Sequence, residues 1–379
     1  MSVRGTADEG YGPVAEAFAS VLPEDRRGGA ALALYRDGRL VVDLWGGTAR
    51  TEPATPWERD TMSLLWSATK GVTTVLVLRL AERGLLDLDA PVARYWPEFG
   101  QAGKERITLR HVLGHRAGLP LLEGELGFAE LMRWQPPVTV LQGQKPRWEP
   151  GTAYAYHGFT FGWILGEVIR RVTGYSVGAH LRQDLAEPLG LDLHLGVPEP
   201  ERGRVARQEG PDHPMPTPPP EHVLYRILTV NGAIEFPGLD SPHGWNAPAL
   251  LGAELPATAG VGTARSLAGL YAATVTGIDG RPPLLGAATL QDALRPLSRG
   301  GSWPDGMDLG AVWGSGFHLD GPFWHTLGSG SFGHDGTGGT HAFGDVEHRV
   351  GYAFVTSRLG GAQDTREERL MAAVRRCLG

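Results

Sequence analysis

The chain has 379 residues and a mass of 40.7 kDa, and its 35 basic and 42 acidic side chains give a net charge of −7. A net acidic chain lacks the positive field with which proteins bind nucleic acids, so we expect no nucleic-acid partner. No apolar run reaches the ~18 residues of a membrane-spanning helix, and the amino terminus has no hydrophobic signal core. We therefore predict a globular chain, located in the cytoplasm, with no membrane partner.

Two residue types are rare in this chain. The one cysteine, Cys377, excludes an internal disulfide framework and a cysteine metal cluster. The lysines are Lys70, Lys104 and Lys145, and all other basic residues are arginines. Because lysine is so uncommon here, a lysine at a catalytic interval from a serine is less easily ascribed to chance.

Helical and β-like segments alternate in a simple order along the chain. The spacing of apolar residues predicts a helix over 11–22, and Asp37-Gly38 between two apolar runs predicts a β-hairpin. Residues 66–83 indicate a buried helix that ends at Gly84. Further helices are expected at 106–115, 157–173, 263–275 and 364–377.

The last third of the chain is glycine-rich and β-like, with apolar runs at 340–345 and 350–359. Strands at both ends and helices between them favour an α+β fold, in which an antiparallel sheet built from both chain ends is flanked by helices. We predict a single domain in which a mostly helical subdomain, about 85–254, is inserted into an α/β subdomain, about 1–84 plus 255–379. Residues 197–220 are proline-rich and are interpreted either as a surface linker or as a loop over a binding cleft.

Ser67 and Lys70 form the first candidate catalytic pair. If Ser67 opens the predicted helix, Lys70 lies one turn further along the same face, next to N–H groups that favour a developing oxyanion. A buried lysine with a lowered pKa can serve as the base for a serine nucleophile. The alternative is an ordinary N-cap serine with an exposed lysine.

Two further segments contain candidate functional residues. Tyr156 precedes the helix predicted at 157–173, so its phenol either points into a cleft or packs with its hydroxyl bonded to backbone. Residues 332–345 are rich in glycine and histidine, and the small residues allow a strand edge to approach a ligand.

Taken together, the three segments resemble the serine β-lactamase and penicillin-recognising superfamily, and most closely its class C-like family VIII carboxylesterases. The order S-x-x-K, P-G-T-x-x-x-Y and H-x-G before a β-hairpin matches that family over about residues 12–375. The resemblance implies that Ser67 is the acylated nucleophile, Lys70 the buried lysine that manages its proton and Tyr156 the proton shuttle to the leaving group. It further implies that the backbone N–H groups of Ser67 and Thr337 form the oxyanion hole.

The chain departs from the β-lactamase pattern at two places. Gly158 stands where β-lactamases have asparagine, and His334-Asp335-Gly336 stands where they have Lys-Thr-Gly. The second change removes a cation that pairs with the antibiotic's carboxylate. Both departures favour neutral acyl substrates. The candidate substrate-binding residues are His334, Asp335, Gly336, Tyr154, Trp245 and Trp313.

Other sites are less consistent with the sequence. His111 and His115 have the i,i+4 spacing of zinc ligands, but no glutamate follows His111, so the metalloprotease pattern is incomplete. The G-x-G-x-x-G at 328–333 does not open a helix, which argues against a dinucleotide-binding site. The five histidines from His318 to His348 fit no standard zinc-finger spacing, so we predict structural or pocket roles for them. We therefore predict no metal and no cofactor. There is no G-x-S-x-G, so no α/β-hydrolase nucleophile competes with Ser67.

The sequence thus predicts a serine hydrolase that acts on small or medium acyl esters through an acyl-enzyme. The alternatives are an acyltransferase of the same fold in natural-product biosynthesis, an amidase or β-lactamase-type hydrolase, and an inactive binding protein. The oligomeric state is left open.

Overall fold

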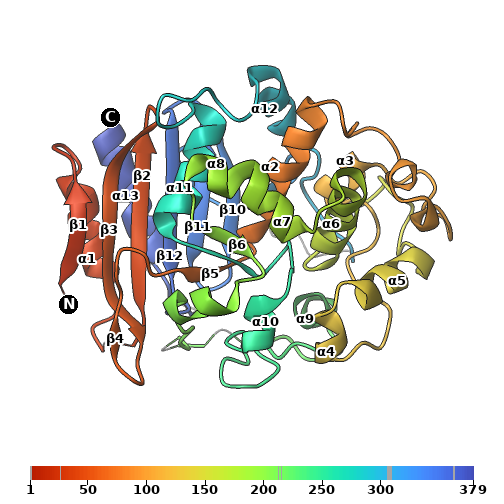
Figure 1. The fold of residues 1–379 in the computed structure, drawn as a ribbon, viewed down its shortest axis with the longest axis horizontal. Coiled ribbons are helices and arrows are strands. Elements are labelled where there is room, and N and C mark those ends of the chain that lie inside the picture. The colour runs from red at the N-terminus through yellow and green to blue at the C-terminus, as the bar shows by residue number, and fades with distance from the viewer. Residues whose placement is uncertain (1, 26, 212, 215, 305–309, 362) are drawn as a thin grey trace.

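The computed structural model describes residues 2–25, 27–211, 213–214, 216–304, 310–361 and 363–379, and Figure 1 shows its fold. In this part of the chain, the main sheet has nine strands and every neighbouring pair is antiparallel. Its order is β1 (Val3–Ala7), β3 (Arg39–Arg50), β2 (Gly29–Arg36), β12 (Val350–Thr356), β11 (Thr340–Asp345), β10 (Ser331–Gly336), β9 (His318–Leu319) and β8 (Val312–Trp313), with β4 (Thr55–Pro56) paired to β3.

The sheet joins the two ends of the chain, as predicted. Ala33 of β2 pairs with Ala353 of β12, more than 300 residues later in the sequence. The hairpin between β2 and β3 turns at Asp37 and Gly38, which both have the positive φ that a two-residue hairpin requires. The α+β class with an antiparallel sheet from both chain ends is therefore confirmed.

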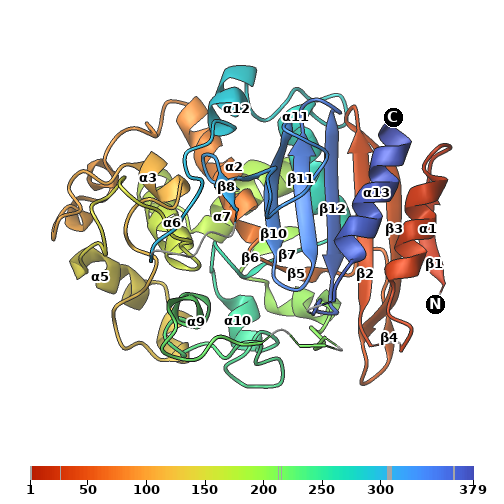
Figure 2. The same cartoon turned by 180° about the vertical axis from the view of Figure 1, so that it is seen from behind.

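Helices cover both faces of this sheet. On one face lie α1 (Gly12–Val21) and α13 (Arg366–Leu378), seen in front of the sheet in Figure 2. On the other face lie α11 (Ala264–Val275) and α2 (Thr69–Glu82). Burial of apolar side chains between these layers is the main favourable contribution to folding.

The segments between the two chain ends are mostly helical and pack beside α2 (Figure 1). A second, three-stranded sheet has the order β5 (Ser63–Trp66), β7 (Gly260–Gly262) and β6 (Leu193–Leu195). The helices of this part are α3 (Leu109–Leu113), α4 (Phe128–Leu131), α5 (Gln135–Gly143), α6 (Thr160–Thr173), α7 (Val177–Leu181), α8 (Glu187–Leu189), α9 (Val223–Thr229), α10 (Pro248–Gly252) and α12 (Ala287–Ala293), with short 3-10 helices at Val92–Arg94, Pro97–Phe99 and Glu199–Arg204 and a π-helical turn at Arg182–Ala186.

Helix ends follow the local chemistry. Gly84 follows the C-cap of α2 and Gly174 caps α6, both with the positive φ that favours glycine at these positions. Three helices are shorter than predicted by three residues or more: 106–115 contains only α3, and the helices expected over 66–83 and 157–173 begin at Thr69 and Thr160. The first ends early because Gly114 caps it and His115 takes a left-handed φ of 59°.

Among the described residues, no helix combines the length and apolarity needed to span a bilayer.

Candidate active site

Ser67 lies in a sharp turn between β5 and α2 rather than inside the helix. The helix begins at Thr69 with Ala68 as its N-cap, so the Ser67 hydroxyl is not used for capping. Trp66, the residue before it, has φ +51°, a left-handed conformation that is rare for a residue with a side chain. The Thr69 hydroxyl stabilises the turn because it donates to the Trp66 carbonyl at 2.6 Å and accepts the Gly260 N–H at 2.9 Å.

The structure brings Ser67, Lys70 and Tyr156 together. The Tyr156 hydroxyl donates to Ser67 Oγ at 2.7 Å, and Lys70 Nζ lies 3.5 Å from the same oxygen. Lys70 Nζ also donates to the Ala257 carbonyl at 2.9 Å and lies 4.6 Å from the centre of the Tyr156 ring. These contacts place an amine and a phenol on one serine hydroxyl.

Burial changes the protonation of both partners. Lys70 is fully buried, and this burial lowers its pKa well below the usual range, while the Asp335 carboxylate offsets only part of the shift. Burial raises the pKa of the Tyr156 phenol well above its usual value, although the hydrogen bond with Ser67 acts in the opposite direction. Burial therefore favours the neutral amine of Lys70 and keeps the phenol of Tyr156 protonated at neutral pH.

Strand β10 closely approaches the segment just before Ser67 at Gly336. A Cβ atom at this position would lie 2.4 Å from the Leu65 carbonyl oxygen, so only glycine allows this packing. The next residue, Thr337, lines one small cavity together with Ser67 and Tyr156. The structure thus brings Thr337 and Ser67 to the wall of one cavity.

This cavity, which we call the nucleophile pocket, is small, and half of its lining residues are aromatic. Its volume is about 20 Å³, close to the space of one water molecule or a methyl group. Ring contacts connect part of the wall, with Trp66 4.2 Å from Trp245 and 6.5 Å from Phe236 between ring centres. The lining residues are Trp66, Ser67, Tyr156, Gly158, Phe159, Leu228, Phe236, Trp245, Thr258 and Thr337.

Helix α9 closes one side of the nucleophile pocket, and Gly158 permits this approach. A Cβ atom at Gly158 would lie 2.9 Å from Ile227 Cγ2 and 3.0 Å from the Ile227 carbonyl oxygen. Leu228, the next residue of the helix, lines the pocket. Sequence reasoning missed Phe159, Leu228 and Phe236, and no local pattern marks the last two, because their segment meets Ser67 only in the folded chain.

The predicted residues His334, Asp335 and Trp313 lie in an aromatic and histidine-rich layer beside Tyr156. Trp313 stacks on Tyr156 at 5.7 Å and on His318 at 4.3 Å between ring centres. The Asp335 carboxylate accepts a hydrogen bond from His318 Nδ1 at 3.2 Å. Burial tends to raise the pKa of Asp335, but this hydrogen bond and the neighbouring histidines lower it overall. Burial lowers the pKa of His334 to about 3.

Tyr154 differs from Tyr156 in its surroundings. It is buried against Ala311 and Trp313, and its hydroxyl donates to the Gly300 carbonyl. This tyrosine therefore has a packing environment, two residues from the tyrosine that contacts Ser67.

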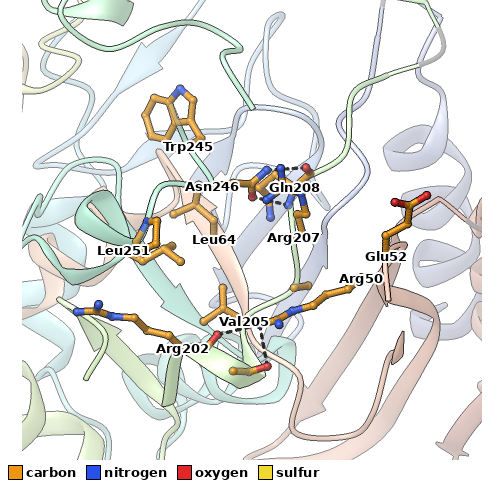
Figure 3. A pocket seen from close by; sticks show the side chains of 13 residues that line it. Arg50, Glu52, Leu64, Arg202, Val205, Arg207, Gln208, Trp245, Asn246 and Leu251 are labelled. Atoms are coloured by element: carbon orange, nitrogen blue, oxygen red, sulfur yellow. Dashed lines mark hydrogen bonds between the residues drawn. The ribbon is translucent and has the colours of Figure 1, made fainter. Parts of the chain in front are cut away.

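Trp245 also lines a larger hollow of about 400 Å³ (Figure 3). Residues 202–208, at the start of the proline-rich segment, form part of its wall, and Arg50 donates to the carbonyls of Arg202 and Gly203 at 3.3 and 3.1 Å. The segment thus borders a hollow, although Asp212 and Met215 lie outside the described residues. Its described lining residues do not include Ser67, Lys70 or Tyr156.

The two histidines with zinc-like spacing each accept a hydrogen bond from a backbone N–H group. His111 Nδ1 accepts the Thr108 N–H at 3.3 Å, and His115 Nδ1 accepts the His157 N–H at 3.1 Å. Within the described ranges, no three His, Cys, Asp or Glu side chains are grouped so that they could hold a metal ion.

Known proteins resemble this chain over most of its length. A family model described as Beta-lactamase matches residues 14–376. The esterase/beta-lactamase LipL of Mycobacterium tuberculosis is 37% identical over 377 residues, which cover 94% of this chain and 83% of that protein. The crystal structure of a family VIII carboxylesterase superposes with a TM-score of 0.87 at 31% identity, covering 100% of both chains. Monacolin J acid methylbutanoyltransferase of Aspergillus terreus is 34% identical over 36% of this chain and 38% of its own.

Proposed function

This chain belongs to the beta-lactamase family, and on that premise we propose that it hydrolyses carboxylic esters through an acyl-enzyme on Ser67. The observation that carries the proposal is the contact of the Ser67 hydroxyl with both Tyr156 and Lys70, at 2.7 and 3.5 Å. The names of LipL and of the structurally similar carboxylesterase support ester substrates in particular.

The protonation states suggest how the proton moves. In the neutral form that burial favours, Lys70 has a lone pair that accepts the Ser67 proton as Oγ attacks the carbonyl carbon. Tyr156, which is protonated, donates its proton to the oxygen of the leaving alcohol and regains one from Lys70. An ester and the serine then yield an acyl-enzyme and an alcohol, and water hydrolyses the acyl-enzyme by the reverse path.

The backbone N–H groups of Ser67 and Thr337 stabilise the tetrahedral oxyanion in this proposal. The close packing of Gly336 against Leu65 supports it, because this packing holds Thr337 next to the nucleophile. The small volume and aromatic wall of the nucleophile pocket favour short, compact, apolar groups near the reacting carbonyl. Asp335 disfavours substrates that carry a carboxylate, because it adds a negative charge close to Lys70.

The decisive test is the mass of the covalent intermediate. We expect wild-type protein, mixed with a panel of p-nitrophenyl esters, to gain the mass of each acyl group at Ser67. Ser67→Ala should show no such gain and should lose about 10³-fold or more of the hydrolysis rate. Retention of a fluorophosphonate label by Ser67→Ala would contradict the assignment of the nucleophile. A β-lactam belongs in the same panel, and we expect it to acylate more slowly than a neutral ester.

Acyl transfer is the second candidate, and the partial similarity to the monacolin J acid methylbutanoyltransferase favours it. The same acyl-enzyme can pass its acyl group to an alcohol instead of water. Adding alcohols or amines to the reaction distinguishes the two functions: a transferase forms the new ester or amide at low acceptor concentration, whereas a hydrolase releases mainly free acid.

A further inference from the structure

The backbone N–H groups of the residues immediately before and after Tyr156 are both held by a single residue, His115. The N–H of Ala155 donates to the carbonyl oxygen of His115 at 3.1 Å. The N–H of His157 donates to the side-chain Nδ1 of His115, also at 3.1 Å. Tyr156 lies between these two anchors, and its hydroxyl donates to Ser67 Oγ.

The backbone of His115 has the conformation that this double contact requires. Its φ of 59° is left-handed, which a residue with a side chain rarely adopts, and it directs the carbonyl and the imidazole toward one segment. The side chain is fully buried, and its ring lies 5.2 Å from the Tyr156 ring and 4.5 Å from the Trp313 ring. The phenol ring therefore packs against both His115 and Trp313, which also contact each other.

The hydrogen bonds also define the tautomer of each histidine. Because His115 Nδ1 accepts a hydrogen bond, the neutral ring carries its proton on Nε2, which has no partner within the described part of the chain. Burial keeps this ring neutral by lowering its pKa well below the usual value, and the neighbouring His157, Lys70, His334 and His318 act in the same direction. His157 accepts the Leu119 N–H on Nε2 at 3.1 Å and donates from Nδ1 to the Ala155 carbonyl at 2.6 Å, so it stiffens the same segment.

We propose that His115 is the positioning residue of Tyr156: by holding the peptide N–H groups on both sides, it keeps the phenol at hydrogen-bond distance from Ser67. The inference rests on the proton-transfer role given to Tyr156 above and adds a residue to it. Such a role explains the strained backbone and the unpartnered Nε2, because the fold retains histidine here for the acceptor at Nδ1. A displacement of about 1 Å at a reacting group can cost about 100-fold in rate.

A matched pair of variants tests the role of Nδ1. In His115→Asn the amide oxygen can accept at about the position of Nδ1, whereas the side chain of His115→Gln reaches the Nε2 position and has no acceptor at Nδ1. We expect His115→Gln to lower kcat about 10–100-fold with little change in KM. His115→Asn should retain kcat within about fivefold. Equal losses in the two variants would overturn the proposal.

A double-mutant cycle with Tyr156→Phe separates positioning from general destabilisation. Once the phenol hydroxyl is absent, its position no longer matters, so His115→Gln should change kcat by less than about twofold in that background. Additive losses overturn the inference while leaving the role of Tyr156 intact. A Tyr156→Phe variant with full activity would contradict both the positioning role of His115 and the proton-transfer role of Tyr156. If His115→Gln fails to fold, the same cycle is measured with His115→Asn. The small loss of kcat in that variant should then disappear in the Tyr156→Phe background.

His180 provides the structural control. It is a buried histidine on α7, and its Nε2 also has no partner in the described chain. We expect His180→Gln to lower the melting temperature as much as His115→Gln does, but to leave kcat unchanged on both alkyl and p-nitrophenyl esters. A parallel fall of kcat and melting temperature in both variants would overturn the positioning role.

Discussion

At the scale of single residues, two tyrosines only two positions apart have different environments. The Tyr156 hydroxyl contacts Ser67, whereas the Tyr154 hydroxyl contacts a backbone carbonyl in a packed aromatic cluster. Tyr154 is buried and Tyr156 is partly buried against the same cluster. In both, removing only the hydroxyl oxygen keeps the ring in place and so tests chemistry rather than packing.

We expect Tyr156→Phe to lower kcat by roughly 10²–10⁴-fold, the range for lost general acid–base catalysis. The loss should be larger for an alkyl ester than for the p-nitrophenyl ester of the same acid, since the alkoxide needs protonation as it leaves. Tyr154→Phe is the control and should change kcat less than about tenfold. Similar mild losses at both positions would show that the proton passes through another group.

Lys70 should make the stability of the protein depend on pH. It is neutral in the folded state above its lowered pKa, whereas in the unfolded chain it binds a proton up to a pH of about 10.4. Between these two values the unfolded state holds one more proton, so this residue makes the wild type more stable as pH rises, by about 1.4 kcal/mol per unit.

Lys70→Met removes this dependence and the base together. We expect the variant to show no ester hydrolysis. Its free energy of unfolding, measured relative to that of the wild type, should rise as the pH falls from 9 to 7, because only the wild type loses stability over this range. Urea denaturation of both proteins at several pH values measures the difference. A difference that is independent of pH would mean that Lys70 is charged in the folded protein.

At the scale of elements, α2, which carries Lys70, contacts Tyr271 of α11. The contact depends on Gly71, because a Cβ atom there would lie 2.0 Å from the Tyr271 hydroxyl oxygen but 3.2 Å from the ring carbon that bears it. The Tyr271 hydroxyl is buried and has no hydrogen-bond partner among the described residues. Its oxygen therefore sets how closely the two helices approach without contributing a bond.

This contact predicts a rescue. Gly71→Ala alone should destabilise the protein by about 1–3 kcal/mol through overpacking. Tyr271→Phe should be nearly neutral, because it removes an unpaired oxygen. In the double variant most of the loss should disappear, leaving a coupling of at least about 1 kcal/mol in a denaturation cycle. Purely additive effects would mean that the helices shift apart instead.

At the scale of the whole molecule, the two chain ends form one sheet and one core. Leu370, Met371 and Val374 of α13 are buried in the same cluster as Phe18 of α1 and Phe354 of β12. Because strands from both ends are neighbours in this sheet, damage at the last helix should reach the active site through global unfolding.

Leu370→Asp tests this coupling. Burying an unpaired carboxylate costs several kcal/mol, a large part of the roughly 5–15 kcal/mol by which such proteins are stable. We expect loss of the cooperative thermal transition and of ester hydrolysis, although Leu370 is not among the residues that line the nucleophile pocket. Ala372→Asp, on the exposed face of the same helix, should change neither. A folded, inactive Leu370→Asp protein would argue against the global mechanism.

The sequence by itself determined the features that depend on near neighbours. The Asp37-Gly38 turn, the helix stops at Gly84 and Gly174 and the strands near the end of the chain follow from turn chemistry, capping and hydrophobic periodicity, which act over a few residues. The spacing of Ser67 and Lys70 was also visible, because three residues along the chain are one turn of backbone.

Only the tertiary structure decided what these residues can do. Ser67 and Tyr156 are 89 positions apart, and no local pattern sets the 2.7 Å between their oxygens. The lowered pKa of Lys70 results from burial among distant segments, and the anchoring of Tyr156 depends on a left-handed backbone at His115. Desolvation and long-range contact are properties of packing, and packing exists only once the whole chain has folded.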